Sequence, residues 1–182
     1  MGSCNSCPSK GTCGKDEQSC GIVNNPQNKI KNIIGVMSGK GGVGKSTMSV
    51  MIAKELAARG YQVGVLDADI TGPSIPRLFH IENERARGTE QLIYPVETAE
   101  GIKVTSLNLV VEKEDEAVIW RGPAITGIVN QFRTGVYWGE LDYLIIDMPP
   151  GTGDVPLTVM QSIPIKGVVM VSIPQDIISM IV

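Results

Sequence analysis

The segment Ser38-Gly39-Lys40-Gly41-Gly42-Val43-Gly44-Lys45-Ser46-Thr47 lies between an apolar run, Ile33 to Met37, and a pattern of apolar residues at helical spacing. It fits the general form G-x-x-x-x-G-K-[ST], in which a glycine-rich turn directs consecutive backbone N–H groups at a polyphosphate. The positive end of the following helix points at the same place. We therefore expect Lys45 to reach the outer phosphates and Ser46 to hold Mg²⁺. The simpler interpretation, a loop that merely turns, explains neither the strand before it nor the helix after it.

The composition bounds the class of protein. The chain has 182 residues, enough for one α/β domain with a full core, and 42% of them are hydrophobic. Aromatic residues make up 4% and the net charge is -3, so neither base stacking nor a broad basic surface for nucleic acid is expected. No apolar run approaches the roughly 20 residues of a membrane helix, and the polar start is unlike a signal peptide. We expect a cytoplasmic protein that binds neither nucleic acid nor membrane.

The cysteines are confined to the start of the chain, among residues too polar to form a core of their own. They are Cys4, Cys7, Cys13 and Cys20. A disulfide framework is not expected in a cytoplasmic protein. Cys4-x-x-Cys7 brings two thiolates onto one turn, which suits zinc and iron–sulfur sites alike, and free thiols are a third interpretation. We expect residues 1–31 to form a cysteine-rich tail and linker, and residues 32–182 a nucleotide-binding domain.

Two buried strands of the expected sheet end in aspartates. Tyr61 to Leu66 is followed by Asp67-Ala68-Asp69, and the strand from Asp142 ends at Asp147. Ligands of α/β proteins bind at the carboxyl ends of strands. We expect Asp69 to orient an attacking water, Asp67 to lie nearer the metal shell, and Asp147 to hold the hydration shell of Mg²⁺. Capping of a strand–helix turn is the simpler interpretation of the first pair.

The turn after Asp147 is rich in glycine and proline, Met148-Pro149-Pro150-Gly151-Thr152-Gly153. A sensor of the γ-phosphate needs a backbone N–H that is free to approach it, and we expect Gly151 or Gly153 to supply one.

The remaining patterns alternate buried strands with helices, which predicts an α/β fold of three layers: a mostly parallel sheet with helices on both faces. Strands are expected at 31–37, 61–66, 92–95, 102–107, 142–147 and 167–173, and helices up to Arg59 and near 75, 125–132 and 158–163. Met48, Met51, Ile52 and Leu56 recur at helical spacing, and we expect them to pack into the core. The charged segments 82–91 and 112–116 are expected to be exposed loops.

The early lysine of the loop, Lys40, makes the segment resemble the deviant Walker A motif K-G-G-x-G-K-[ST] of MinD, ParA, the nitrogenase iron protein and the Mrp-type iron–sulfur carriers. Other segments are similar to the Mrp/ApbC-type carriers in particular. They are D-A-D-x-x-G-P-S-x-P from Asp67 to Pro76, W-R-G-P from Trp120 to Pro123, and D-x-P-P-G-T-G-D from Asp147 to Asp154. The segment Cys4 to Cys13 resembles the C-x₂-C-x₅-C portion of the amino-terminal motif in cytosolic relatives of these carriers.

This resemblance implies a P-loop ATPase that binds ATP and Mg²⁺ and hydrolyses ATP slowly as a homodimer, with Lys40 crossing to the partner's nucleotide. It implies a [4Fe–4S] cluster on the cysteines, with Cys20 as the fourth ligand and zinc as the runner-up, and transfer of that cluster to apo-proteins. The implied catalytic residues are Lys40, Lys45 and Asp69. The implied nucleotide contacts are Gly39, Lys40, Gly41, Gly42, Val43, Gly44, Lys45, Ser46, Thr47, Asp67, Asp147 and Gly151.

Other interpretations stay open. Lys40 is otherwise a solvated lysine. A positional ATPase of the MinD or ParA kind, acting at membrane or DNA, shares the loop, and a zinc-tailed nucleotide-binding regulator is a third possibility. Mrp-like proteins continue for about another third of the domain, so we expect this chain to be truncated at its carboxyl end.

Overall fold

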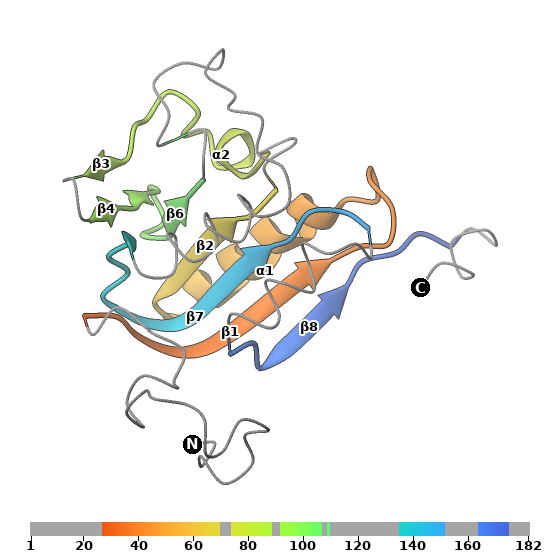
Figure 1. The fold of residues 1–182 in the computed structure, drawn as a ribbon, viewed down its shortest axis with the longest axis horizontal. Helices are drawn as coiled ribbons and strands as arrows, with labels where there is room; N and C mark the ends of the chain where they lie inside the picture. The colour runs from red at the N-terminus through yellow and green to blue at the C-terminus, as the bar shows by residue number, and fades with distance from the viewer. Residues whose placement is uncertain are drawn as a thin grey trace, which may run out of the picture.

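The computed structural model describes residues 27–69, 74–88, 92–106, 109, 135–151 and 164–174. The cysteines and the helices expected at 125–132 and 158–163 lie outside these residues. The described elements are, in chain order, β1 (Lys29–Met37), α1 (Lys45–Ala58), β2 (Val63–Asp67), α2 (Ile75–Leu78), β3 (Arg87–Gly88), β4 (Ile93–Tyr94), β5 (Val96–Glu97), β6 (Lys103–Thr105), β7 (Glu140–Asp147) and β8 (Gly167–Met170) (Figure 1).

A central sheet with the strand order β5-β6-β2-β7-β1-β8 organises the described part of the chain. All of its pairings are parallel except that of β5 with β6. Strand β7 lies between β1 and β2, although it is the penultimate of the described strands in sequence, so residues far apart in the chain meet along its length (Figure 1). The mostly parallel sheet of an α/β fold is therefore confirmed, and its carboxyl edge brings together the residues that follow β1, β2 and β7.

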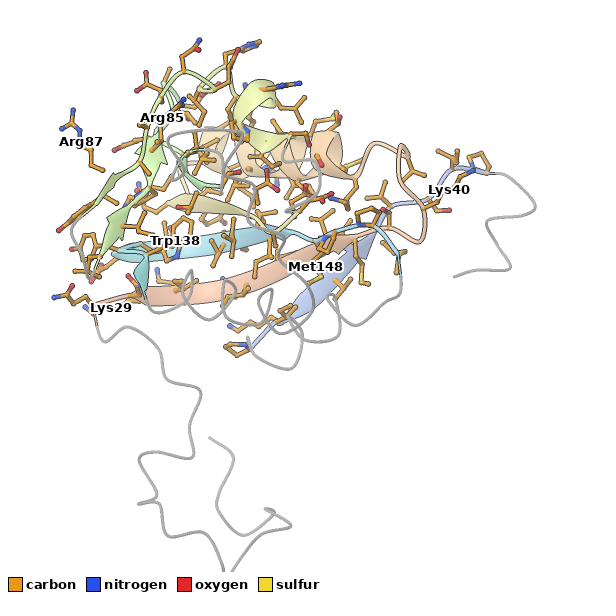
Figure 2. All side chains as sticks on the ribbon, turned by 45° about the horizontal axis from the view of Figure 1, so that its top comes forward. Lys29, Lys40, Arg85, Arg87, Trp138 and Met148 are labelled. Atoms are coloured by element: carbon orange, nitrogen blue, oxygen red, sulfur yellow. The ribbon has the colours of Figure 1, made fainter. Side chains whose placement is uncertain are left out.

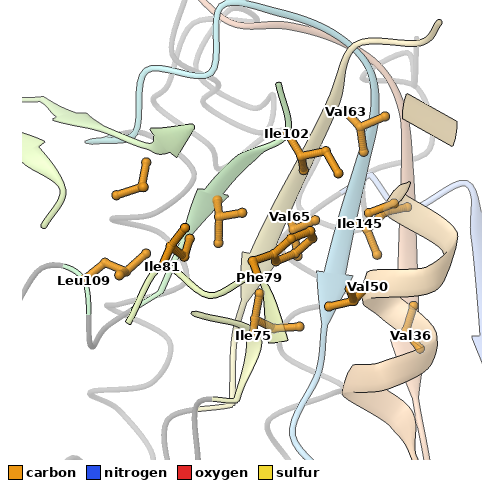
Figure 3. Close-up of a cluster of buried hydrophobic side chains, with 13 residues drawn as sticks. Val36, Val50, Val63, Val65, Ile75, Phe79, Ile81, Ile102, Leu109 and Ile145 are labelled. Carbon is orange, nitrogen blue, oxygen red and sulfur yellow. The ribbon is translucent and has the colours of Figure 1, made fainter. Parts of the chain in front are cut away.

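One face of the sheet packs against both described helices. Alternate residues along the strands point to opposite faces, so Val63 and Val65 of β2 lie on the same side as Ile145 of β7. Val50 of α1 and Phe79, just after α2, pack on them in one continuous buried cluster (Figure 3). This burial of branched side chains fixes the position of α1 over β2 and β7.

The opposite face carries a second cluster, centred on Trp138 and Ile146. Position 64 of β2 is a glycine, and the absence of a side chain there leaves room for Trp138. A Cβ atom at Gly64 would lie 3.0 Å from two carbon atoms of the Trp138 ring and 2.7 Å from Leu141 Cδ1. The indole therefore rests directly on the backbone of a central strand, and Trp138 is 1% exposed.

The expected strands are found with boundaries shifted by a few residues, because strand ends depend on pairing partners that the sequence pattern does not show. The strand expected at 31–37 begins at Lys29, and the one expected at 142–147 begins at Glu140, since these two ends pair with each other. The segment 82–91 is exposed where described, as expected, except that Ala86 packs against the core, and Arg87–Gly88 forms β3 and pairs with β4. Strand β5 was not expected, and two residues are too short for a periodic signal.

The expectation that Met48 and Met51 pack into the core is wrong. Met48 is 38% exposed and Met51 is 59% exposed, whereas Ile52 and Leu56 are half-buried against the core. The buried side chains of α1 are Lys45, Ser49, Val50 and Ala53. Small residues face the sheet because they let the helix approach it closely, and the two methionines lie on the outer side of the helix.

The amino-terminal end of β1 is fastened to the segment before β7. The side chain of Asn28 donates to Val136 O at 2.8 Å and accepts from the backbone N–H groups of Trp138 and Gly139 at 2.8 and 3.1 Å. Lys29, the first residue of β1, lies at the end of the molecule opposite to Lys40 in the glycine-rich loop (Figure 2). Among the described residues no helix is long and apolar enough to cross a membrane.

Candidate nucleotide-binding site

The glycine-rich loop joins the buried end of β1 to the first turn of α1. Gly42 has φ 78° and Gly44 has φ 87°, a left-handed backbone in which a side chain would be strained. Gly44 is the residue that precedes α1, no side-chain hydrogen bond caps the helix, and its first turn carries no acidic residue. No described side chain thus caps the amino-terminal N–H groups of α1, and these groups can bind an anion, as a phosphate site requires.

Strand alternation places two of the expected aspartates beneath this loop. Asp67 follows Val63 and Val65, and Asp147 follows Ile145, so both carboxylates lie on the face of the sheet that α1 covers. The register pairs Asp67 directly with Asp147. Asp67 is 2% exposed and Asp147 is 0% exposed.

Asp147 is surrounded by donors from the first turns of α1. The Lys45 Nζ atom lies 2.9 Å from Asp147 Oδ2, and the hydroxyl of Ser46 donates to the same oxygen at 2.6 Å. The hydroxyl of Ser49 donates to the other oxygen, Oδ1, at 2.8 Å. Because Lys45 is only 7% exposed, this is a buried ion pair whose charges satisfy each other.

Asp67 is held by backbone groups of the segment that follows it. Its carboxylate accepts from the N–H of Asp69 at 3.1 Å and from the N–H of Ile75 at 3.3 Å, and Ser106 Oγ lies 3.4 Å from it. Burial raises the pKa of Asp67 to about 7, and the charge of Asp147 adds to the rise. These contacts tie Asp67 to Asp69, just after β2, and to Ile75, at the start of α2.

Asp69 lies at the rim of the same cluster. Its Oδ2 atom is 4.0 Å from Lys45 Nζ, and its side chain is 13% exposed, in contrast to the fully buried Asp147. The structure therefore brings Lys45, Ser46, Asp67, Asp69 and Asp147 together at the carboxyl edge of the sheet. Of the three aspartates, Asp69 has the most accessible carboxylate and is therefore the best placed to contact water.

The other expected site residues divide into three groups. The loop residues from Gly39 to Thr47 border the cluster, and Lys40 is exposed and points away from the body of the molecule (Figure 2). Cys4, Cys7, Cys13 and Cys20 and the alternative sensor Gly153 lie outside the described residues. Gly151 is described and differs from the expectation, because its N–H donates to Ser38 O at 2.8 Å and is not free for a phosphate.

Two buried hydroxyls of the site were missed by the sequence reasoning. Ser38, 1% exposed, donates to Lys40 O at 3.0 Å within the loop, and Ser49 contacts Asp147. Serine is common and carries no motif signal by itself. The spacing from Lys45 to Ser49, one helical turn, is the signal that could have placed Ser49 on the same helix face.

The donor set suits Mg²⁺. Ser46 Oγ and Asp147 Oδ2 are hard oxygen ligands 2.6 Å apart, beside a loop shaped for phosphates. Mg²⁺ is typically held by one or two such protein groups, with phosphates and waters completing its coordination. Within the described residues no group of three or more His, Cys, Asp and Glu side chains could hold a metal ion alone. Ser46 and Asp147 would therefore hold the ion jointly with a nucleotide.

Comparison with known proteins decides the family. The model of the NUBPL iron-transfer P-loop NTPases, within the ParA group, matches residues 29–182. The chain belongs to this family. The match includes the glycine-rich loop and all three aspartates of the cluster, so the geometry described above is that of an iron-transfer P-loop NTPase.

Individual relatives agree with this assignment. The iron-sulfur cluster carrier protein of Clostridium perfringens is 54% identical over 100% of this chain and 69% of the relative. The nucleotide-binding protein of Archaeoglobus fulgidus, solved in complex with ADP, is 44% identical with a TM-score of 0.71, over 84% of this chain and 59% of that one. The septum site-determining protein MinD of Pyrococcus horikoshii, solved with Mg-ADP, is 18% identical with a TM-score of 0.61, over 84% and 62% of the two chains, and shares the fold. This NTPase chain thus spans between 59% and 69% of the length of these three proteins.

Proposed function

We propose that this chain is the nucleotide-binding part of an ATP-hydrolysing iron–sulfur cluster carrier, which holds a [4Fe–4S] cluster and passes it to apo-proteins. The observation that carries the nucleotide half is the cluster beneath the glycine-rich loop, where Lys45 lies 2.9 Å from Asp147 and Ser46 donates to the same oxygen. Support for the cargo comes from the family and from the name of the Clostridium perfringens relative, which is 54% identical.

The residues of the site take distinct roles in this proposal. Lys45 would bind the outer phosphates in place of Asp147, and Ser46 and Asp147 would hold Mg²⁺, whose charge would offset that of the phosphates. The N–H groups at the start of α1 bind the phosphate oxygens. Asp69, the most accessible of the three carboxylates, orients the water that attacks the γ-phosphate. Asp67 holds the turn that carries Asp69, through the N–H groups of Asp69 and Ile75.

The proposal extends to the assembly and its place in the cell. We propose a cytoplasmic homodimer in which Lys40 reaches the nucleotide of the partner subunit, since it is exposed at the tip of the loop and has no role in its own cluster. The cysteines Cys4, Cys7, Cys13 and Cys20 are the proposed cluster ligands, with zinc as the alternative metal. We also propose that the cysteine-rich tail and linker end at residue 31 and that the nucleotide-binding domain begins at residue 32.

A positional ATPase is the competing function, but its support is weaker. The MinD structure is 18% identical and shares only the fold, whereas the carrier relative is 54% identical over the whole chain. If the competing function held, ATP would drive the protein onto liposomes or plasmid DNA, and the cysteines would be dispensable.

Two measurements test the proposal. Anaerobic reconstitution with iron and sulfide should give a brown protein that absorbs at about 400 nm. This absorbance should be lost in the Cys7→Ser and Cys13→Ser variants and retained in the neighbouring control Ser6→Ala. A colourless protein that retains zinc under these conditions would refute the cluster. ATP hydrolysis should fall by about 10²-fold or more in Asp69→Asn while nucleotide binding persists, and equal hydrolysis by the variant would remove Asp69 from the mechanism.

A further inference from the structure

Ser49 is a buried hydroxyl that none of the roles above uses. It is 0% exposed and lies on the inward face of α1, one turn after Lys45. The neighbouring inward position, Ala53, shows that packing against the sheet requires only a small residue here. A polar atom at a fully buried position needs a partner, and the identity of that partner indicates what the hydroxyl does.

The hydroxyl has two acceptors within reach. Ser49 Oγ lies 2.8 Å from Asp147 Oδ1 and 3.2 Å from the carbonyl oxygen of Lys45. The second contact is the ordinary bond of a helical serine to the carbonyl four residues earlier. A hydroxyl has a single proton, and a bond to a carboxylate is shorter and stronger than one to a neutral carbonyl. The hydroxyl of Ser49 therefore donates its hydrogen bond to Asp147.

The two oxygens of Asp147 have different partners. Oδ2 accepts from Ser46 and faces Lys45, the two residues that the proposed function assigns to Mg²⁺ and to phosphate. Oδ1 faces Ser49. We propose that Ser49 is a positioning residue for magnesium: it holds Oδ1, and thereby keeps Oδ2 directed at the metal position. This inference rests on the proposed nucleotide site and adds a residue to it.

The bond is most important when the site is loaded. With Lys45 engaged by phosphate and Ser46 by the metal, Ser49 is the donor that remains on Asp147 among the described contacts. Asp67, which pairs with Asp147 on the adjacent strand, places a second carboxylate beside it. Without Ser49 the buried carboxylate would lose its fixed orientation and one donor that stabilises its charge. Removal of such an outer partner of a metal ligand typically weakens metal binding about 10–100-fold.

The test measures binding of a fluorescent N-methylanthraniloyl-ADP as a function of Mg²⁺ concentration, without hydrolysis. Ser49→Ala should raise the Mg²⁺ concentration for half-maximal enhancement of binding by about 10-fold or more. Its affinity for the nucleotide in the absence of Mg²⁺ should stay that of the wild type. Ser49→Thr, which retains the hydroxyl, should restore most of the Mg²⁺ response.

Thr105→Val is the matched control, because Thr105 Oγ1 is equally buried and has no hydrogen-bond partner among the described residues. It should leave the Mg²⁺ response unchanged. If Ser49→Ala does not fold, Ser49→Cys keeps the volume with a weaker donor and should show the same loss in smaller degree.

The outcomes separate this inference from the function on which it rests. A wild-type response to Mg²⁺ in Ser49→Ala overturns the positioning role and leaves the nucleotide site intact. Equal losses with and without Mg²⁺ also overturn it, since they indicate a general packing defect. Absence of any Mg²⁺-linked nucleotide binding in the wild type would refute both proposals.

Discussion

The buried pair of Lys45 and Asp147 predicts the response of the nucleotide-free protein to Lys45→Met. Methionine keeps most of the volume of the lysine stem but leaves Asp147, which is 0% exposed, beside Asp67 without a cation. Breaking a buried pair by removing one partner destabilises a protein by about 3–5 kcal/mol. For a chain of this size that free energy corresponds to a fall in Tm of roughly 6–20 °C. Urea unfolding followed by tryptophan fluorescence at pH 8 would measure it.

Two controls isolate the charge. Lys54→Met removes a lysine from the same helix, but Lys54 and its partner Glu100 are 42% and 43% exposed, so we expect a loss below about 1 kcal/mol. The double variant Lys45→Met/Asp147→Asn removes both charges and should be more stable than Lys45→Met alone.

The pH dependence gives a second signature. Without Lys45 the charge of Asp147 has no cation beside it. Asp67, whose folded-state pKa is raised to about 7, is largely neutral at pH 6 and ionised at pH 8, so the variant should be less destabilised at pH 6 than at pH 8. The reasoning fails if Lys45→Met loses no more stability than Lys54→Met, or if the double variant is no more stable than the single one.

Three further predictions follow from the geometry. The pKa of Asp67 is raised from 3.8 to about 7 in the folded state, so the folded state retains a proton that the unfolded state loses, and stability should fall as pH rises from about 4 to 7. In urea titrations over this range, the free energy of unfolding of the wild type relative to Asp67→Asn should drop by up to about 4 kcal/mol. A difference that does not change with pH would contradict the shift. Gly44→Ala should lose about 1–2 kcal/mol because its φ is 87°, whereas Gly167→Ala, with open space and ordinary φ, should lose much less in the same thermal scan. Met51→Gln should change the free energy of unfolding by less than about 0.5 kcal/mol, because Met51 is 59% exposed, whereas Val50→Gln, at a buried position, should be strongly destabilising. Equal losses at the two positions would contradict the outward orientation of Met51.

The sequence predicted the sheet and the meeting of the site residues because both follow from strong local rules. Apolar runs ended by Asp67 and Asp147 indicate buried strands, and the carboxyl ends of parallel strands share one edge. The loop was recognisable from its glycines and its lysine. No local rule gives the order of the strands, so the direct pairing of Asp67 with Asp147 could not be predicted.

The rotation of α1 was the largest error, and its cause is physical. Hydrophobicity alone selected Met48 and Met51 as the inward residues. The helix instead turns Lys45 and Ser49 inward, because their polar atoms find Asp147 there. These polar contacts to the sheet, together with the burial of Val50 and Ala53, set the face of the helix that meets the sheet. The commitment of the Gly151 N–H to Ser38 O was equally invisible, since backbone pairing between loops leaves no pattern in the residue types.

The interior place of β1 in the sheet, between β7 and β8, has a mechanical consequence. Its amino-terminal end, clamped by Asn28, is where the cysteine-bearing residues join the described part of the chain, and its other end leads into the glycine-rich loop. A pull on that junction acts along β1, which is bonded to β7 on one side and β8 on the other. Force applied in this direction shears many hydrogen bonds together and does not peel them apart one at a time. We therefore expect a pull on the amino-terminal residues to leave the phosphate loop undisturbed.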